Sequence, residues 1–295
     1  MDAHRMNRLV LTLIKTVTYI VVAALVLLLV YIIGKGLPHL SWHFLGSESQ
    51  AFLAGGGIRN QLFDSFYILL LTLVISTPLA LLAAIFLAFY APQNSLTDLV
   101  RTTIEVLSSL PSIVVGLFAY LLFVVNFQMG FSLLAGALAL TIFNLPILTR
   151  NFEDALAEID ETQMQGGLAL GFSKWKAITQ IILPAALPSL ITGMILGAGR
   201  IFGEAAALIF TAGQSPAQVD FNNWNPFSST SFLNIMRPAE TLAVHIWKLN
   251  SEGLVQDAAL VSAASATVLV LMVIIFNAGA RILGSYLQKK MMGGK

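Results

Sequence analysis

The chain contains no cysteine among its 295 residues. Disulfides, iron–sulfur clusters, thiolate zinc sites and cysteine nucleophiles are therefore excluded together. Charge is also scarce, because Lys and Arg number 16 and Asp and Glu 15, which is 11% of the chain, and the net charge is +1. No basic cluster is interleaved with aromatic residues, so the electrostatic signature of nucleic-acid binding is missing. We expect no nucleic-acid partner.

The sequence also lacks the common catalytic motifs. It has no Gly-x-x-x-x-Gly-Lys-Ser/Thr loop, so we do not expect this chain to bind ATP through such a loop. His-Glu-x-x-His and Gly-x-Ser-x-Gly are absent as well. His39 and His43 stand four residues apart, but Pro38 adjoins them and no third metal ligand is in view. We predict no metal site, no catalytic residues and no cofactor bound by this chain.

Apolar residues, in contrast, make up 57% of the chain, too many for a water-soluble domain to cover. A bilayer core of about 30 Å takes roughly 20 helical residues, and uncharged windows of that length define six predicted spans. The 44 uncharged residues between Glu105 and Arg150 count as two, with a turn at 126–130. The others are 16–34, 66–90, 187–212 and 258–280. The predicted fold is an all-α membrane protein with six transmembrane helices.

Lys and Arg predict the orientation, because they concentrate in cytoplasmic loops. Eleven of them fall on the side of both tails and four on the other side, so both termini are expected in the cytoplasm of a cell (inner or plasma) membrane. Residues 1–15 form a cytoplasmic tail, and 16–295 form one membrane domain with an uncleaved first span. Loops 34–64 and 213–257 are extracytoplasmic, and 151–186 is a long cytoplasmic segment.

The cytoplasmic segment is predicted to form two short helices bent at a glycine. An acidic run leads into Gln165-Gly166-Gly167, Gly171 suits a helix C-terminal cap, and Ser173 can cap a second helix. Ile181-Ile182-Leu183-Pro184 then turns the chain back toward the membrane. An amphipathic helix on the lipid surface, with Trp175 as an interfacial anchor, is the alternative interpretation.

This segment resembles the signature of ABC-importer permeases: Glu-Ala-Ala, three residues, Gly, nine residues, Ile, any residue, Leu-Pro. Its spacing matches from Gly171 to Ile181, Leu183 and Pro184, whereas Gln165-Gly166-Gly167 replaces Glu-Ala-Ala. The resemblance implies a type I ABC importer permease fold and a coupling helix seated in a cytoplasmic ATPase. Its coupling residues would be Gln165, Gly166, Gly167, Gly171, Phe172, Ile181, Leu183 and Pro184.

Two charges lie inside the fifth predicted span. Arg200 is near its middle, and Glu204 follows four residues later on the same expected helical face. An ionisable group at that depth costs at least about 2.5 kcal/mol, so it should face protein or water and have a partner. The two either pair with each other, or Arg200 stabilises a passing anion while Glu204 holds the guanidinium and prevents trapping. Near the third span, Glu105 is expected to pair with Arg101.

The stretches 199–205 and 208–213 resemble the fifth-span motif of phosphate ABC-importer permeases, and the outer loop resembles their A-type subunit. Sulfate and molybdate permeases share part of this motif and remain the alternative. The resemblance implies a second permease subunit, two ATPase subunits that carry ATP and Mg, and an extracytoplasmic phosphate-binding protein. An intramembrane enzyme with Glu204 or Glu105 as base is a remote alternative, and a purely structural scaffold is less favoured still.

Overall fold

Helices make up almost all of the regular structure. The computed structural model describes residues 3–50, 55–215, 218–252 and 256–291, and within them the only β pairing is an isolated bridge between Asp220 and Ser231. The α-helices are α1 (Ala3–Gly36), α2 (Trp42–Gly46), α3 (Arg59–Ile85), α4 (Ser95–Ser108), α5 (Ser112–Ala119), α6 (Leu133–Ala157), α7 (Glu161–Ala169), α8 (Lys174–Ala177), α9 (Leu183–Phe202), α10 (Ala206–Thr211), α11 (Leu242–Glu252) and α12 (Ala258–Met291). A 3-10 turn η1 (Leu37–His39) and π-helical turns η2 (Phe86–Tyr90), η3 (Tyr120–Asn126) and η4 (Ile178–Ile182) extend or join them.

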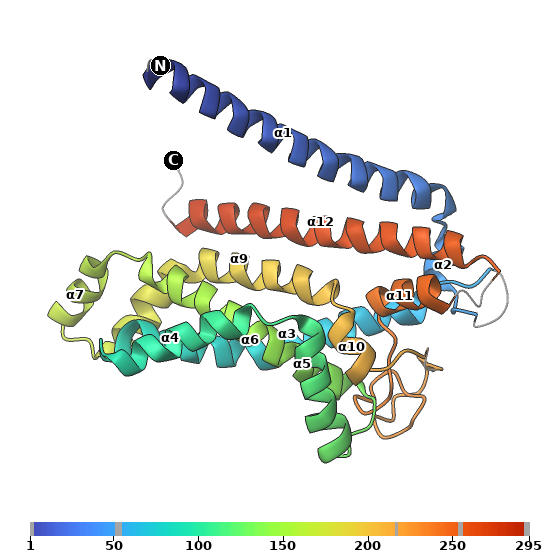
Figure 1. Ribbon diagram of the computed structural model, residues 1–295. Coiled ribbons are helices and arrows are strands. Elements are labelled where there is room, and N and C mark those ends of the chain that lie inside the picture. Colours follow the sequence, from blue (N-terminus) through green and yellow to red (C-terminus); the bar gives the residue numbers. More distant parts are fainter. Residues whose placement is uncertain (1–2, 51–54, 216–217, 253–255, 292–295) are drawn as a thin grey trace.

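Among the described residues, five helical stretches are long and apolar enough to cross a membrane, and a sixth can be counted if one bent helix pair is a single span. Helices α3, α6, α9 and α12 lie side by side, with α7 at one end and α11 at the other (Figure 1). The start of α1 and the end of α12 both point toward the α7 end. This arrangement confirms the predicted all-helical, multi-span fold.

The bundle is held by two apolar clusters, one toward each end. The first joins α3, α6 and α9 to α11, with Phe202 and Leu208 fully buried. The second joins α3 and α6 to α7, η4 and α9 around Phe152 and Ile178. Small residues allow neighbouring helices to approach closely. A Cβ added to Gly116 of α5 would lie 2.6 Å from the Cα of Ala207 in α10.

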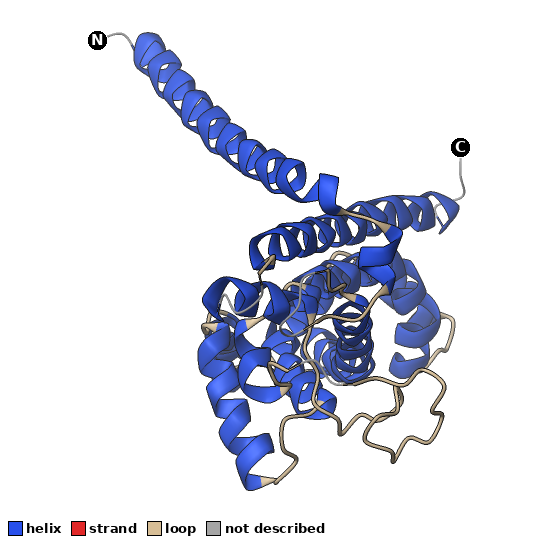
Figure 2. Ribbon diagram, turned by 90° about the vertical axis from the view of Figure 1, so that its right-hand side faces the viewer, coloured by secondary structure: helices blue, strands red, loops and turns tan. Residues whose placement is uncertain are grey.

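Helix α1 diverges from the bundle (Figures 1 and 2). None of its most apolar window is buried, and it meets α12 only toward its C-terminal end. There the Thr267 hydroxyl donates a hydrogen bond to the Ile32 carbonyl at 3.0 Å, and Gly36 approaches the Ala263 carbonyl so closely that a Cβ would lie 2.1 Å from it. The first predicted span is confirmed as a helix, and its exposed apolar surface requires lipid or another protein chain around it.

The third predicted span is sharply bent. Helices α4 and α5 meet at a 98° bend across Ser109–Pro111 (Figure 1). Pro111 explains the break, because proline has no N–H to donate and disfavours helical backbone at the preceding residue. The predicted turn at 126–130 is confirmed, with positive φ at Gln128 (53°) and Gly130 (64°).

The fifth span also differs from its predicted bounds of 187–212. Its helix runs without interruption from Lys174 through η4 to Phe202, and the chain then leaves the helix before α10 begins at Ala206. The predicted turn at Ile181–Pro184 is therefore wrong, because Pro184 lies in the first turn of α9, where its missing N–H costs little. The change of direction occurs earlier, around Gly171.

A buried ion pair fixes the loop before α11 onto α3. Arg237 donates two hydrogen bonds to the Asp64 carboxylate, and both side chains are at most 1% exposed. Beside them, buried Glu240 accepts a 2.8 Å hydrogen bond from Gln61 and lies 3.7 Å from the Lys248 ammonium. The Arg237–Asp64 and Gln61–Glu240 contacts join residues 173 and 179 positions apart, so they hold this end of the bundle together.

We predict that Asp64→Asn destabilises the protein severely. The substitution keeps the shape of the side chain but leaves Arg237 buried without a counter-charge, which typically costs about 3–5 kcal/mol. The midpoint of thermal unfolding in detergent should fall clearly. Asp98→Asn, the same change at an exposed position of α4, is the control and should shift stability by no more than about 0.5 kcal/mol. Equal midpoints for the two variants would contradict this role of the pair.

Candidate functional site

The junction between α9 and α10 brings both predicted charges to a break in the fifth span. Gly203 caps α9 by donating its N–H to the Gly199 carbonyl at 3.3 Å. Glu204 follows outside the helix, and its carboxylate accepts the N–H of Ala207 at 3.3 Å, within the first turn of α10. Glu204 therefore caps the short helix that follows.

Arg200 occupies the last turn of α9, and its side chain is exposed. Its guanidinium carbon lies 4.4 Å from the centre of the Phe143 ring on α6. Among the described residues no ion pair includes Arg200, so the expected contact with Glu204 is wrong. The physical reason is the break: because α9 ends at Phe202, positions 200 and 204 do not share a helical face.

A buried polar side chain, Asn144, lies close to the last turns of α9, which carry Arg200. Asn144 follows Phe143 on α6, is 1% exposed, and faces Gly197 of α9, where a Cβ would lie 3.4 Å from its Oδ1. Neither its amide nitrogen nor its oxygen has a hydrogen-bond partner among the described residues. An unsatisfied buried amide is costly, so packing alone does not explain Asn144 at this position.

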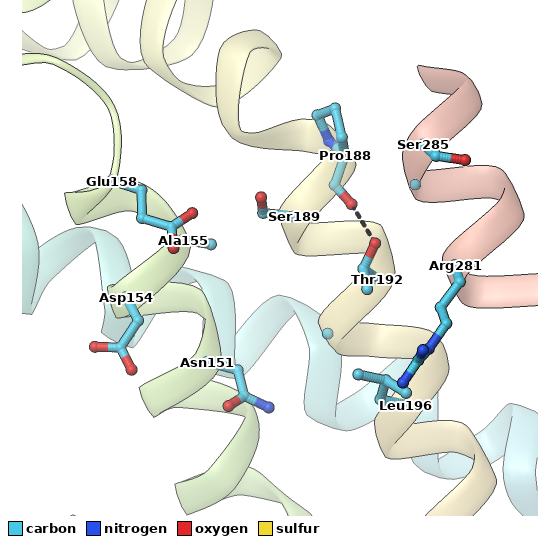
Figure 3. A pocket seen from close by; sticks show the side chains of 12 residues that line it. Asn151, Asp154, Ala155, Glu158, Pro188, Ser189, Thr192, Leu196, Arg281 and Ser285 are labelled. Atoms are coloured by element: carbon cyan, nitrogen blue, oxygen red, sulfur yellow. Dashed lines mark hydrogen bonds between the residues drawn. The ribbon is translucent and has the colours of Figure 1, made fainter. Parts of the chain in front are cut away.

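A cavity of about 470 Å³ opens between α6, α9 and α12 on the α7 side of Arg200 (Figure 3). Leu196, one helical turn before Arg200, lines it, so the cavity and the guanidinium share a face of α9. Arg281 reaches across from α12 toward Leu196, whereas Asp154 and Glu158 stand on the α6 wall. The cavity thus carries charged side chains of both signs on its walls.

The first of the two predicted short helices is confirmed as α7, whereas the second begins as α8 but continues without interruption into α9. Asp160 caps α7 by accepting the Thr162 N–H at 2.9 Å, and this hydrogen bond holds the pKa of the Asp160 carboxyl below its ordinary value of 3.8. A lowered pKa in the folded state means that the cap is present at neutral pH and is lost as the pH falls through that lowered value. Gly171 adopts φ +83° after α7, and Ser173 accepts the Lys176 N–H at 3.3 Å to cap α8.

Some of the residues predicted for coupling pack against the bundle, and the others are exposed to solvent. Gly167 is buried, and a Cβ there would lie 2.6 Å from Ile181 Cδ1. Phe172 and Leu183 pack against the apolar cluster at this end of the bundle. The remaining ones are exposed: Gln165, Gly166, Gly171 and Pro184. Three large apolar side chains of the same segment are exposed as well, namely Leu168, Leu170 and Trp175.

Two sets of contacts at this end of the bundle were not predicted, and the first ties the α7–α8 segment to η2. Lys174 donates to the Phe89 carbonyl in η2 and lies 4.8 Å from the ring centre of Tyr90. Arg101 of α4 pairs with Glu153 of α6 at 2.8 Å, so the expected Arg101–Glu105 pair is wrong. A movement of α7 and α8 would therefore be passed to the ends of several long helices.

A family model described as the binding-protein-dependent transport system inner membrane component matches residues 76–293. The chain belongs to this family. It is therefore an ABC importer permease, a multi-span protein of the inner membrane. The match covers the helix breaks, the Arg200 site and the α7–α8 segment described above.

The curated relatives of this chain are permease proteins as well. It is 51% identical over 272 residues, 92% of each chain, to the probable ABC transporter permease protein YqgI of Bacillus subtilis. It is 31% identical over 276 residues to the phosphate transport system permease protein PstA of Pasteurella multocida, covering 94% of this chain and 93% of that one. PstA of Xylella fastidiosa is 37% identical over 181 residues, covering 61% and 63%.

A solved structure shares the permease fold. A bacterial ABC transporter involved in the import of the acidic polysaccharide alginate aligns with a TM-score of 0.61 and 15% identity, covering 95% of this chain and 97% of that chain. At this identity the likeness concerns the fold alone.

Proposed function

We propose that this permease is a transmembrane subunit of an ATP-driven importer of inorganic phosphate and forms half of its translocation pathway. The observation that carries the proposal is the exposed Arg200 guanidinium at the α9–α10 break, which pairs with no carboxylate among the described residues. The names of the PstA relatives support phosphate as the substrate.

The position of Arg200 supports a pathway role on physical grounds. A cation within a membrane span is expensive to place in hydrocarbon, so the exposed side of Arg200 must face water or another protein chain. In an importer that side is the pathway between two permease subunits. Guanidinium donates paired hydrogen bonds that fit a tetrahedral oxyanion, and a passing phosphate would supply the missing counter-charge. Glu204, half-buried beside it, fixes the break and discourages trapping of the anion.

The two ends of the bundle offer binding surfaces for the other proteins of the proposed complex. The positive-inside distribution puts the α7 end and both tails in the cytoplasm. There the exposed Leu168, Leu170 and Trp175 offer an apolar surface for a groove in a cytoplasmic ATPase, two copies of which would bind ATP and Mg. At the other end, the loops before α3 and α11 would receive phosphate from an extracytoplasmic binding protein.

Sulfate and molybdate importers remain the alternative, because the same guanidinium chemistry suits any tetrahedral oxyanion. The deciding experiment is uptake of labelled phosphate into vesicles that contain the whole complex, with each anion as competitor. We expect unlabelled phosphate to suppress uptake and equimolar sulfate or molybdate to leave it nearly unchanged. Stronger suppression by sulfate or molybdate than by unlabelled phosphate would reassign the substrate, as would uptake of labelled sulfate or molybdate by a complex that takes up no labelled phosphate.

We predict that Arg200→Gln reduces ATP-dependent phosphate uptake at least about 100-fold, because losing a charge-assisted contact of roughly 3 kcal/mol with the passing anion has that effect on a rate. The complex should still assemble, since Arg200 makes no ion pair with any other described residue of the chain. Arg8→Gln, at an exposed position of α1, is the matched control and should transport normally. Normal uptake by Arg200→Gln would remove this residue from the mechanism.

We also predict that Gly171→Val uncouples or detaches the ATPase. A β-branched residue cannot easily adopt φ +83°, so the bend between α7 and α8 must change although no neighbour obstructs the side chain. Copurification of the ATPase and its stimulation by loaded binding protein are the measurements. Gly279→Ala, in open space on α12 and outside the coupling segment, should leave both unchanged. An undisturbed ATPase in Gly171→Val would count against the coupling role.

A further inference from the structure

We propose that Phe143 is a positioning residue for anion passage: its ring holds the Arg200 guanidinium at the pathway wall while leaving the full positive charge available to the anion. This inference rests on the proposed function and deepens it. It assigns to an aromatic side chain of α6 the role that the sequence suggested for Glu204.

The geometry is that of a cation–π contact. The Arg200 guanidinium carbon lies 4.4 Å from the ring centre, well inside the roughly 6 Å over which such contacts act. Phe143 is 6% exposed, so packing within α6 fixes its ring. Arg200, in contrast, is exposed. The contact therefore joins a rigid platform to a cation whose outer side is open.

The choice of an aromatic partner has an electrostatic consequence. A carboxylate would neutralise the guanidinium, occupy its N–H groups and compete directly with a passing anion. A phenyl ring attracts the cation through its quadrupole, carries no net charge and accepts no conventional hydrogen bond from the edge of the guanidinium. The Arg200 N–H groups thus stay available for an oxyanion.

Arg237 of the same chain differs, because a carboxylate neutralises its charge. That guanidinium also lies near a ring, 6.0 Å from the centre of Phe63, but its N–H groups bond to the buried Asp64 carboxylate. Arg237 is 2% exposed and serves packing. Where the arginine is structural the fold supplies a carboxylate, and where it is exposed at a helix break the fold supplies an aromatic ring.

The test replaces Phe143 with phenylalanines that carry one, two, three and five fluorine atoms. Fluorination weakens and finally reverses the ring quadrupole while nearly preserving shape, so a packing role would barely respond. The readout is the maximal rate of anion uptake and the number of anions moved per ATP in proteoliposomes containing the whole complex. We expect both to fall stepwise, to about one tenth with five fluorines, the loss expected for a strong cation–π contact. Phe143→Leu should behave like the most fluorinated variant, and Phe143→Tyr should retain at least about half of the rate.

Phe152 provides the matched control. It lies on the same helix, is 2% exposed and sits in an apolar cluster, so the same fluorination there should leave uptake unchanged. Full uptake with pentafluorophenylalanine at position 143, or an equal loss at position 152, would overturn the inference. The series is measured with whichever oxyanion the wild-type complex transports. Sulfate uptake without phosphate uptake would therefore overturn only the proposed substrate, and a wild-type complex that moves no oxyanion would overturn both proposals.

Discussion

The cost of placing charge inside an apolar helix bundle shapes this permease. Asp64 and Arg237 neutralise each other inside the protein, and neither side chain is exposed to water. At Arg200 the face of Phe143 packs against the guanidinium, and within the part of the chain that the structure describes no carboxylate pairs with it. In our account the transported anion supplies the counter-charge.

Two helix breaks make this arrangement possible. Ser109–Pro111 separates α4 from α5, and Gly203–Ala205 separates α9 from α10. Gly116 of α5 packs against Ala207 of α10, so the two broken segments support each other. Interrupted helices within a membrane are tolerated where the freed backbone lies against protein or lines a cavity. Their direct contact therefore fits a pathway region better than a lipid-facing surface.

The sequence predicted the features that depend on local composition. Apolar windows located α3 and α12, and the turn residues Gly171 and Ser173 located the bend between α7 and α8. It failed where distant residues compete: Arg101 has Glu105 one turn away, yet pairs with Glu153, 52 positions along the chain. The break after Arg200 was hidden because residues 203–212 remain apolar enough to continue a helix. Phe143 gave no signal at all, since a phenylalanine in an apolar run is ordinary until its neighbour is known. The family resemblance supplied the coupling segment and the phosphate assignment, and it is the family that the comparisons confirm.

The most direct test of the central claim is whether water reaches position 200 in the assembled complex. The chain has no cysteine, so Arg200→Cys can be labelled singly, with Leu28→Cys on the apolar face of α1 as the comparison. With partner subunits that also lack cysteine, a charged, membrane-impermeant thiol reagent should modify position 200 in open membrane fragments and leave position 28 unmodified. If position 200 reacts only with a lipid-soluble maleimide, its side chain faces hydrocarbon and the account of anion passage is contradicted.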